Sequence, residues 1–229
     1  MNFRYFYFFI ECSVFVLPDL IFENAMENAL LAYQKDDLIR TEKYVEIALR
    51  TSPLNLEALQ LQSIVHLASD RHESAVKIME KLIDLGGGSN PINYANYVEA
   101  LRSTGEYSKA RKVGYEALNL YPESAPLLLN VAAIESETEN YDQALSIIEK
   151  SINLNPTSTR AWNLAGNILF ALGKFDIAEN LYTNAVEYVK NDSLVWFRLG
   201  AAKHRLDKIE EALPCYQKYN NLIEIRNII

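Results

Sequence analysis

Asparagine and arginine side chains from residue 96 onward are the groups best suited to bind another molecule. An asparagine amide both donates and accepts hydrogen bonds, so it can pair with a peptide backbone. Asn96 and Asn130 lie 34 residues apart. A guanidinium group pairs with carboxylate or phosphate, and Arg160, Arg198 and Arg205 make this part of an acidic chain locally basic. The residue types therefore suit contact with a peptide backbone and, at the arginines, with acidic or phosphorylated groups.

Residues typical of catalysis are scattered rather than grouped. Cys12 and Cys215 are far apart, and His66, His72 and His204 form no metal-ligand spacing with them or with one another. The sequence has no glycine-rich phosphate loop and no Ser or Cys nucleophile partnered by a histidine. We therefore predict no catalytic residue, no metal, no cofactor, and two free thiols of the kind found in a reducing compartment.

Composition narrows the class of partner. The chain has 229 residues, of which 49% are hydrophobic, so it can bury a sizeable core. Lys and Arg number 22 against 30 Asp and Glu, which gives a net charge of −8. An acidic surface repels phosphate backbones, so nucleic acid is a poor partner.

The elements that position the polar residues follow from an internal repeat. Sliding the chain by 34 residues, with one step of 35, aligns a column of small side chains. Large apolar or aromatic residues open most units, and Pro53, Pro122 and Pro156 close three of them. The small column consists of Thr41, Ala75, Ala110, Ala144, Ala178 and Ala212. The predicted domains are an N-terminal segment 1–21, six units (22–55, 56–90, 91–124, 125–158, 159–192 and 193–226, together 22–226) and a tail, 227–229.

Each unit reads as two amphipathic helices separated by a turn. A helix pair cannot bury its apolar face alone, so neighbouring units must stack, and small residues are expected where helices cross closely. A bulky residue at Ala144 or Ala178 would overpack such a crossing. The turns are predicted at Asp36, Asp70, Gly105, Glu139, Gly173 and Asp207.

These columns resemble the tetratricopeptide repeat family. The 34-residue period, the run of Trp162, Gly166, Gly173, Phe175 and Ala178, and the closing prolines carry the resemblance, which covers all but about twenty N-terminal residues and the tail. It implies an all-α, right-handed superhelical solenoid of antiparallel helix pairs, whose first helices line a concave groove. Candidate peptide-binding residues on those helices are Asn96, Glu99, Arg102, Asn130, Arg160, Asn163, Asn167, Arg198 and Arg205.

The resemblance also frames the function. Asn96 and Asn130 are similar to the start of the asparagine ladder in the repeats of O-linked N-acetylglucosamine transferases, although Leu61, Leu164 and Arg198 interrupt it. We expect a non-catalytic scaffold that binds an extended peptide or short helix in the groove. The alternative is the substrate-recognition arm of a glycosyltransferase-like enzyme whose catalytic domain is absent from this chain. Helical RNA-binding repeats are disfavoured by the acidic charge.

A carboxylate clamp for the end of a chaperone tail is a narrower alternative within the family. Asn130 and Arg160 match two of its positions, but Ala95 and Glu99 replace the lysine and asparagine of its first helix. We therefore discount this mode of binding.

The N-terminal segment is apolar from Tyr5 to Leu17. The run is too short for a membrane span and contains Glu11, and Pro18 lies where a preceding unit would close. We expect residues 1–21 to form a capping helix or degenerate half-repeat of a cytoplasmic protein. An export signal or membrane anchor is the alternative.

Two other departures from the repeat predict local behaviour. Gly86 to Gly88 are expected to form the softest joint of the array, and Pro214 is expected to kink its helix or delay its start. The last helix carries apolar residues on more than one side, which predicts end-to-end self-association or docking of a following helix. These residues are Tyr219, Leu222, Ile223, Ile225, Ile228 and Ile229.

Overall fold

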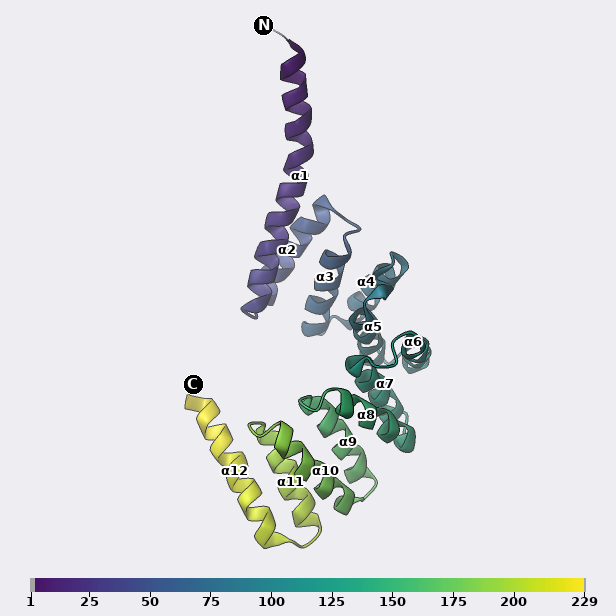
Figure 1. The fold of residues 1–229 in the computed structure, drawn as a ribbon, viewed down its shortest axis with the longest axis vertical. Helices are drawn as coiled ribbons and strands as arrows, with labels where there is room; N and C mark the ends of the chain where they lie inside the picture. The colour runs from purple at the N-terminus through teal and green to yellow at the C-terminus, as the bar shows by residue number, and fades with distance from the viewer. Residues whose placement is uncertain (1–2, 229) are drawn as a thin grey trace. The chain divides into compact units, whose positions relative to one another are not determined.

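The computed structural model describes residues 3–228, with side chains from 18 to 225, and every regular element in that range is helical. The chain divides into two compact units, 1–106 and 107–229. The helices follow one another as antiparallel pairs, which confirms the all-α repeat array (Figure 1). The right-handed sense of a superhelix stays a prediction.

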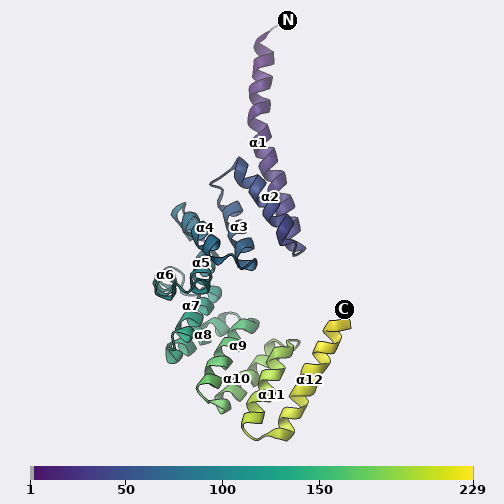
Figure 2. The ribbon, with the colours of Figure 1, turned by 180° about the vertical axis from the view of Figure 1, so that it is seen from behind.

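The helices follow the expected order of pairs, except that α1 begins well before residue 22. The first unit contains α1 (Phe3–Gln34), α2 (Leu38–Thr51), α3 (Leu56–Ala68), α4 (His72–Asp84), the 3-10 turn η1 (Gly87–Ser89) and α5 (Pro91–Ser103). The second contains α6 (Tyr107–Leu120), α7 (Ala125–Glu137), α8 (Tyr141–Leu154), α9 (Thr159–Ala171), α10 (Phe175–Tyr188), α11 (Ser193–Arg205) and α12 (Ile209–Ile228). Both views show α9 to α12 packed side by side (Figure 1, Figure 2).

The predicted turn residues are confirmed by their backbone conformation. All six have positive φ, between 55° and 80°, which reverses the chain between the two helices of a pair. Only glycine adopts this region freely, and Asp tolerates it better than most residues. The six are Asp36, Asp70, Gly105, Glu139, Gly173 and Asp207.

The small column is buried, as expected for residues at helix crossings. Thr41 and the four alanines from Ala75 to Ala178 are fully buried, and Ala212 is 2% exposed. The tryptophans that open the last two units hydrogen-bond to the backbone that follows the preceding helix pair. The indole of Trp162 donates to the carbonyl of Pro156, and that of Trp196 donates to the carbonyl of Lys190, both at 2.8 Å.

The N-terminal helix differs from the expectation. α1 is one helix from Phe3 to Gln34, and Pro18 lies inside it, so the prediction that Pro18 ends a preceding helix is wrong. The capping role of residues 1–21 stays a prediction, and the side chains of Glu11 and Cys12 lie outside the described ones. Among the described residues, no helix combines the length and apolar character that crossing a membrane requires.

The glycines after α4 lie in an ordered turn, and the softness expected of this joint stays a prediction. Gly86 has φ of 94°, so a side chain there would be strained. Gly87 is buried, and an added Cβ would lie 2.7 Å from the carbonyl oxygen of Leu82. The amide of Asn93 donates to the carbonyl of Gly87 at 2.8 Å. The glycines therefore let the chain pack closely between α4 and α5.

The last helix also differs in detail. α12 begins at Ile209, so Pro214 does not delay its start and lies inside it. Tyr219 packs against Phe197 with ring centroids 5.2 Å apart, whereas Ile209 and Leu213 are 47% and 54% exposed. Self-association stays a prediction, and Ile228 and Ile229 lie outside the described side chains.

Candidate binding surface

The nine candidate residues all lie on the first helix of a pair. Asn96, Glu99 and Arg102 are on α5 in the first compact unit, and the other six are on α7, α9 and α11 in the second. On α5, Asn96 is half-buried, and Arg102 pairs with Glu99 at 2.9 Å. Two of the three predicted binding residues on α5 are therefore paired with each other.

In the second unit, α9 contacts both α7 and α11, so the structure brings their polar residues onto neighbouring helices. Asn130 on α7 is buried, whereas Arg160 and Asn167 on α9 are exposed. The guanidinium of Arg205 lies over the ring of Phe175, 4.5 Å from its centroid. This cation–π contact fixes the position of Arg205 beside the turn that precedes α10.

Tyr182 is the residue of this surface that sequence reasoning missed. Its side chain is fully buried, and its hydroxyl lies against Gly166, where an added Cβ would approach to 2.0 Å. Gly166 is one turn along α9 from Asn163. Burial raises the pKa of Tyr182 to about 12, and the nearby positive charge of Arg198 opposes that shift. Gly166 is the feature of the sequence that indicates this contact, because a glycine leaves room for a large ring.

Three polar atoms of this region have no hydrogen-bond partner among the described residues. They are the Tyr182 hydroxyl, Oδ1 of Asn163 and Nε of Arg198, and each is buried. Buried polar groups in native proteins nearly always have a partner. The three atoms come from α9, α10 and α11, where α10 and α11 pack on each other and both contact α9.

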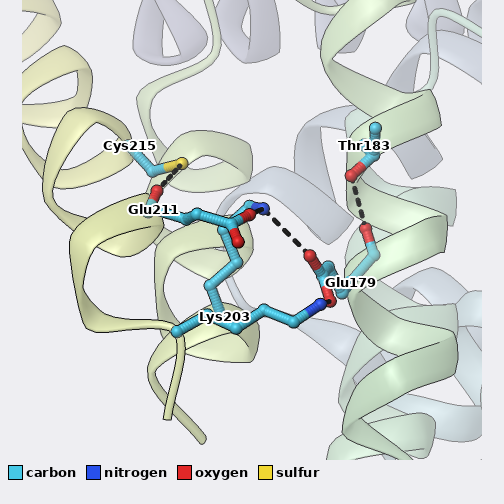
Figure 3. Close-up of polar contacts among 6 residues, drawn as sticks. Glu179, Thr183, Lys203, Glu211 and Cys215 are labelled. Atoms are coloured by element: carbon cyan, nitrogen blue, oxygen red, sulfur yellow. Dashed lines mark hydrogen bonds and ion pairs between the residues drawn. The ribbon is translucent and has the colours of Figure 1, made fainter. Parts of the chain in front are cut away.

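A separate ionic cluster joins α10, α11 and α12 (Figure 3). Nζ of Lys203 donates to Glu179 at 2.9 Å and to Glu211 at 2.6 Å, and Lys208 donates to Glu179 at 2.7 Å. Cys215 lies beside it, with its sulfur 3.6 Å from the carbonyl oxygen of Glu211. Burial raises the pKa of the Cys215 thiol, which disfavours the nucleophilic thiolate.

These ionic contacts predict a pH dependence of stability. Hydrogen bonds from Lys208 and Lys203 lower the pKa of Glu179, and one from Arg71 lowers that of Glu42, from the usual 4.5. A carboxyl pKa lowered by folding stabilises the native state above the unfolded-state pKa, and that contribution disappears as pH falls through the folded-state pKa. The wild type should therefore melt above the double variant Glu42→Gln with Glu179→Gln at neutral pH.

The difference between these two proteins should shrink between about pH 5 and about pH 3. Thermal melting followed by circular dichroism at a series of pH values measures it. The variant Glu46→Gln with Glu187→Gln, which alters carboxylates on exposed positions of α2 and α10, is the control. A difference that stays constant across this range would show that the two carboxylates do not stabilise the fold through their charge.

Comparison with known families identifies the repeats. Models described as tetratricopeptide repeat match residues 125–158 and residues 163–220. The chain is similar to the BBSome complex member BBS4 homolog of Drosophila melanogaster, 22% identical over 83% of this chain and 39% of that protein. It is also similar to human Protein O-mannosyl-transferase TMTC1, 23% identical over 73% of this chain and 19% of that protein. The chain thus spans less than half of each of these relatives.

Solved structures agree on the fold. A thermophilic TPR protein from Thermus thermophilus aligns with a TM-score of 0.67 and 19% identity, over 79% of this chain and 98% of that one. The Pseudomonas aeruginosa protein pilF aligns with a TM-score of 0.69 and 17% identity, over 92% of this chain and 93% of that one. At this level of identity the likeness concerns architecture alone.

Proposed function

Since this chain is a tetratricopeptide repeat protein, we propose that it is a non-catalytic scaffold that binds an extended peptide or short helix along its first helices. Repeat arrays of this kind present extended surfaces to protein partners. The single observation that carries the proposal is the convergence of Tyr182, Asn163 and Arg198, whose buried polar atoms have no hydrogen-bond partner among the described residues. A peptide group or side chain of the partner satisfies them once the side chains that cover them move aside on binding.

The charge of this surface selects the partner. Arg160 and Arg205 are exposed on the same helices as Asn163 and Arg198, so the second unit offers several cations and amides to one ligand. Guanidinium groups bind carboxylate and phosphate through charge-assisted hydrogen bonds. The partner segment is therefore acidic or phosphorylated where it meets α9 and α11. Asn96, Glu99, Arg102, Asn130 and Asn167 complete the proposed set on α5, α7 and α9.

Substitution of the arginines tests the proposal. We expect Arg160→Gln with Arg198→Gln to weaken binding of acidic peptides about tenfold or more, because hydrogen bonds to charged groups contribute about 1.5–3 kcal/mol each. An array of random-sequence peptides, in acidic, phosphorylated and neutral sets, selects the probe. Fluorescence anisotropy then measures the affinity.

The control is Arg50→Gln on α2, whose side chain is 80% exposed and lies on a second helix. It should bind as the wild type does. Equal affinity of the wild type and the Arg160/Arg198 variant, with unchanged helicity, would remove this surface from consideration. Loss of binding to neutral peptides alone would contradict the acidic or phosphorylated partner.

A second candidate function is the substrate-recognition arm of a glycosyltransferase-like enzyme. The specific observation in its favour is the similarity to a protein named as an O-mannosyl-transferase, of which this chain spans 19%. In that case the catalytic domain belongs to a part of the protein outside these residues. Reading the gene beyond the codon for Ile229 distinguishes the two functions, since a scaffold needs no catalytic domain there.

A cytoplasmic location completes the proposal. Cys215 is a free thiol, and structural disulfides are typical of exported proteins. Fractionation of cells that express the chain, with residues 1–21 intact and removed, tests whether that segment directs it elsewhere.

A further inference from the structure

Among the interactions of the described residues, buried or half-buried ion pairs recur at one place in the repeat, in the first, third and fifth joints between repeats. A joint is the contact of the second helix of one repeat with the first helix of the next. The carboxylate or arginine on the second helix directly follows the small residue of the column: Glu42 after Thr41, Arg111 after Ala110 and Glu179 after Ala178. Its partner lies 24 residues later on the first helix of the next repeat.

The first joint, between α2 and α3, is acidic on the second helix. The carboxylate of Glu42 accepts a hydrogen bond from Arg71 at 2.5 Å, and Nε2 of His66 lies 3.5 Å from the same carboxylate. Arg71 follows Glu42 by 29 residues. The negative charge is thus on α2 and the basic groups belong to the next repeat.

The third joint, between α6 and α7, has the opposite order. Glu135 on α7 is fully buried and accepts from Arg111 and from the hydroxyl of Tyr115, both on α6 and both at 2.9 Å. Asn140, at the position that corresponds to Arg71, donates to the other oxygen of Glu135 at 2.9 Å. The positive charge is on the second helix here, and the carboxylate belongs to the next repeat.

The fifth joint, between α10 and α11, returns to the first order. Glu179 on α10 receives Lys203 from α11 and Lys208 from the turn that follows it. Thr183 stands at the position that corresponds to Tyr115. The order of charges therefore alternates from one polar joint to the next.

The joints between them are apolar at the same positions. In the second joint, between α4 and α5, the corresponding residues are Val76 and Ala100, which are 7% and 0% exposed. In the fourth, between α8 and α9, they are Leu145 and Leu169, which belong to one hydrophobic cluster. At this pair of positions, ion pairs and apolar pairs thus alternate through the five joints, although the second joint also contains a hydrogen bond from Tyr97 to Glu80.

From this pattern we infer that the alternating joints are a register key, which prevents the repeats of this chain from stacking on the wrong repeats of the same chain or of a second copy. A stack that is shifted by one repeat places a charged residue against an apolar position, for example Glu42 against Ala100. A charge buried without a partner is strongly unfavourable.

A stack shifted by two repeats keeps polar joints on polar joints, but it brings like charges together. The second helix of the first repeat would place Glu42 against Glu135, and that of the third repeat would place Arg111 against Lys203 and Lys208. Shifts in the other direction pair Glu179 with Glu135. Each two-repeat shift of a polar joint is therefore rejected by charge, which the similar apolar columns of the repeats cannot do.

Transplanting one joint into another tests the register key. The variant Glu179→Arg, Thr183→Tyr, Lys203→Glu, Lys208→Asn and Glu211→Gln gives the fifth joint the residues of the third, including the counterpart of Gln143, and leaves no carboxylate facing the new glutamate. Its native stacking keeps complementary charges, but the second helix of the third repeat now also matches the first helix of the sixth. We expect cooperative melting and, on refolding from urea at rising protein concentration, a several-fold larger oligomeric fraction than in the wild type by light scattering.

The matched control is Glu179→Asp, Thr183→Ser, Lys203→Arg and Lys208→Arg, which keeps the original order of charges and should refold as the wild type does. The reverse exchange, Arg111→Glu with Glu135→Lys, gives all three polar joints the same order of charges. It is the test variant if the first one does not fold. The inference is wrong if the variant that folds also refolds to monomer with the same yield as the control at every protein concentration.

Discussion

Replacing Glu135 by alanine should lower the free energy of unfolding by about 2–4 kcal/mol. The carboxylate is fully buried on α7 and accepts hydrogen bonds from Arg111, Tyr115 and Asn140. Its removal leaves three donors without their acceptor at once. The side chain of Arg111 is 43% exposed and recovers water, so the larger part of the loss comes from Tyr115 and Asn140.

Urea unfolding followed by circular dichroism measures this loss as a lower midpoint. Glu149→Ala, which removes an exposed carboxylate from the neighbouring helix α8, is the control and should leave the midpoint nearly unchanged. Glu135→Gln should fall between the two, because an amide oxygen still accepts hydrogen bonds. A midpoint for Glu135→Ala equal to that of Glu149→Ala would mean that the ionic cluster contributes nothing to stability.

The repeat made most of the fold predictable from sequence. A column of small residues at a fixed period marks helix crossings, and each unit must reverse its chain at the same place. The positive φ of Asp36 and Glu139 and the full burial of Ala144 and Ala178 follow from that periodicity. These features depend on local spacing, which one chain displays six times.

What escaped prediction depends on contacts that differ between repeats. A glutamate such as Glu135 reads as a solvated residue until Arg111 is known to lie across the joint. Pro18 reads as a helix end because it interrupts backbone hydrogen bonding, yet α1 continues through it. The candidate residues lie on first helices, as the repeat predicts, whereas Tyr182 on α10 belongs to a second helix and was outside the residues considered.

Gly166→Ala should be the most damaging of the small substitutions, with a loss of about 2–3 kcal/mol. Alanine normally stabilises a helix by about 1 kcal/mol relative to glycine, so a loss of stability on this substitution would by itself indicate a steric clash. The added Cβ would lie 2.0 Å from the hydroxyl oxygen of Tyr182 and 2.3 Å from Cζ of the same ring. Because the ring is fully buried, it cannot move aside without disturbing the packing of α10 against α9.

The next repeat and the preceding one supply the controls. Gly200→Ala makes the same change where the Cβ would lie 2.8 Å from Tyr216, a half-buried ring that can shift, so it should cost much less. The fourth repeat has the buried residues Ala132 and Ile148 at the corresponding positions. Gly166→Ala combined with Tyr182→Ile should therefore recover most of the stability, since the smaller side chain leaves room for the methyl group. Equal urea midpoints for Gly166→Ala and Gly200→Ala, or losses that simply add in the double variant, would show that Tyr182 does not require a glycine on α9.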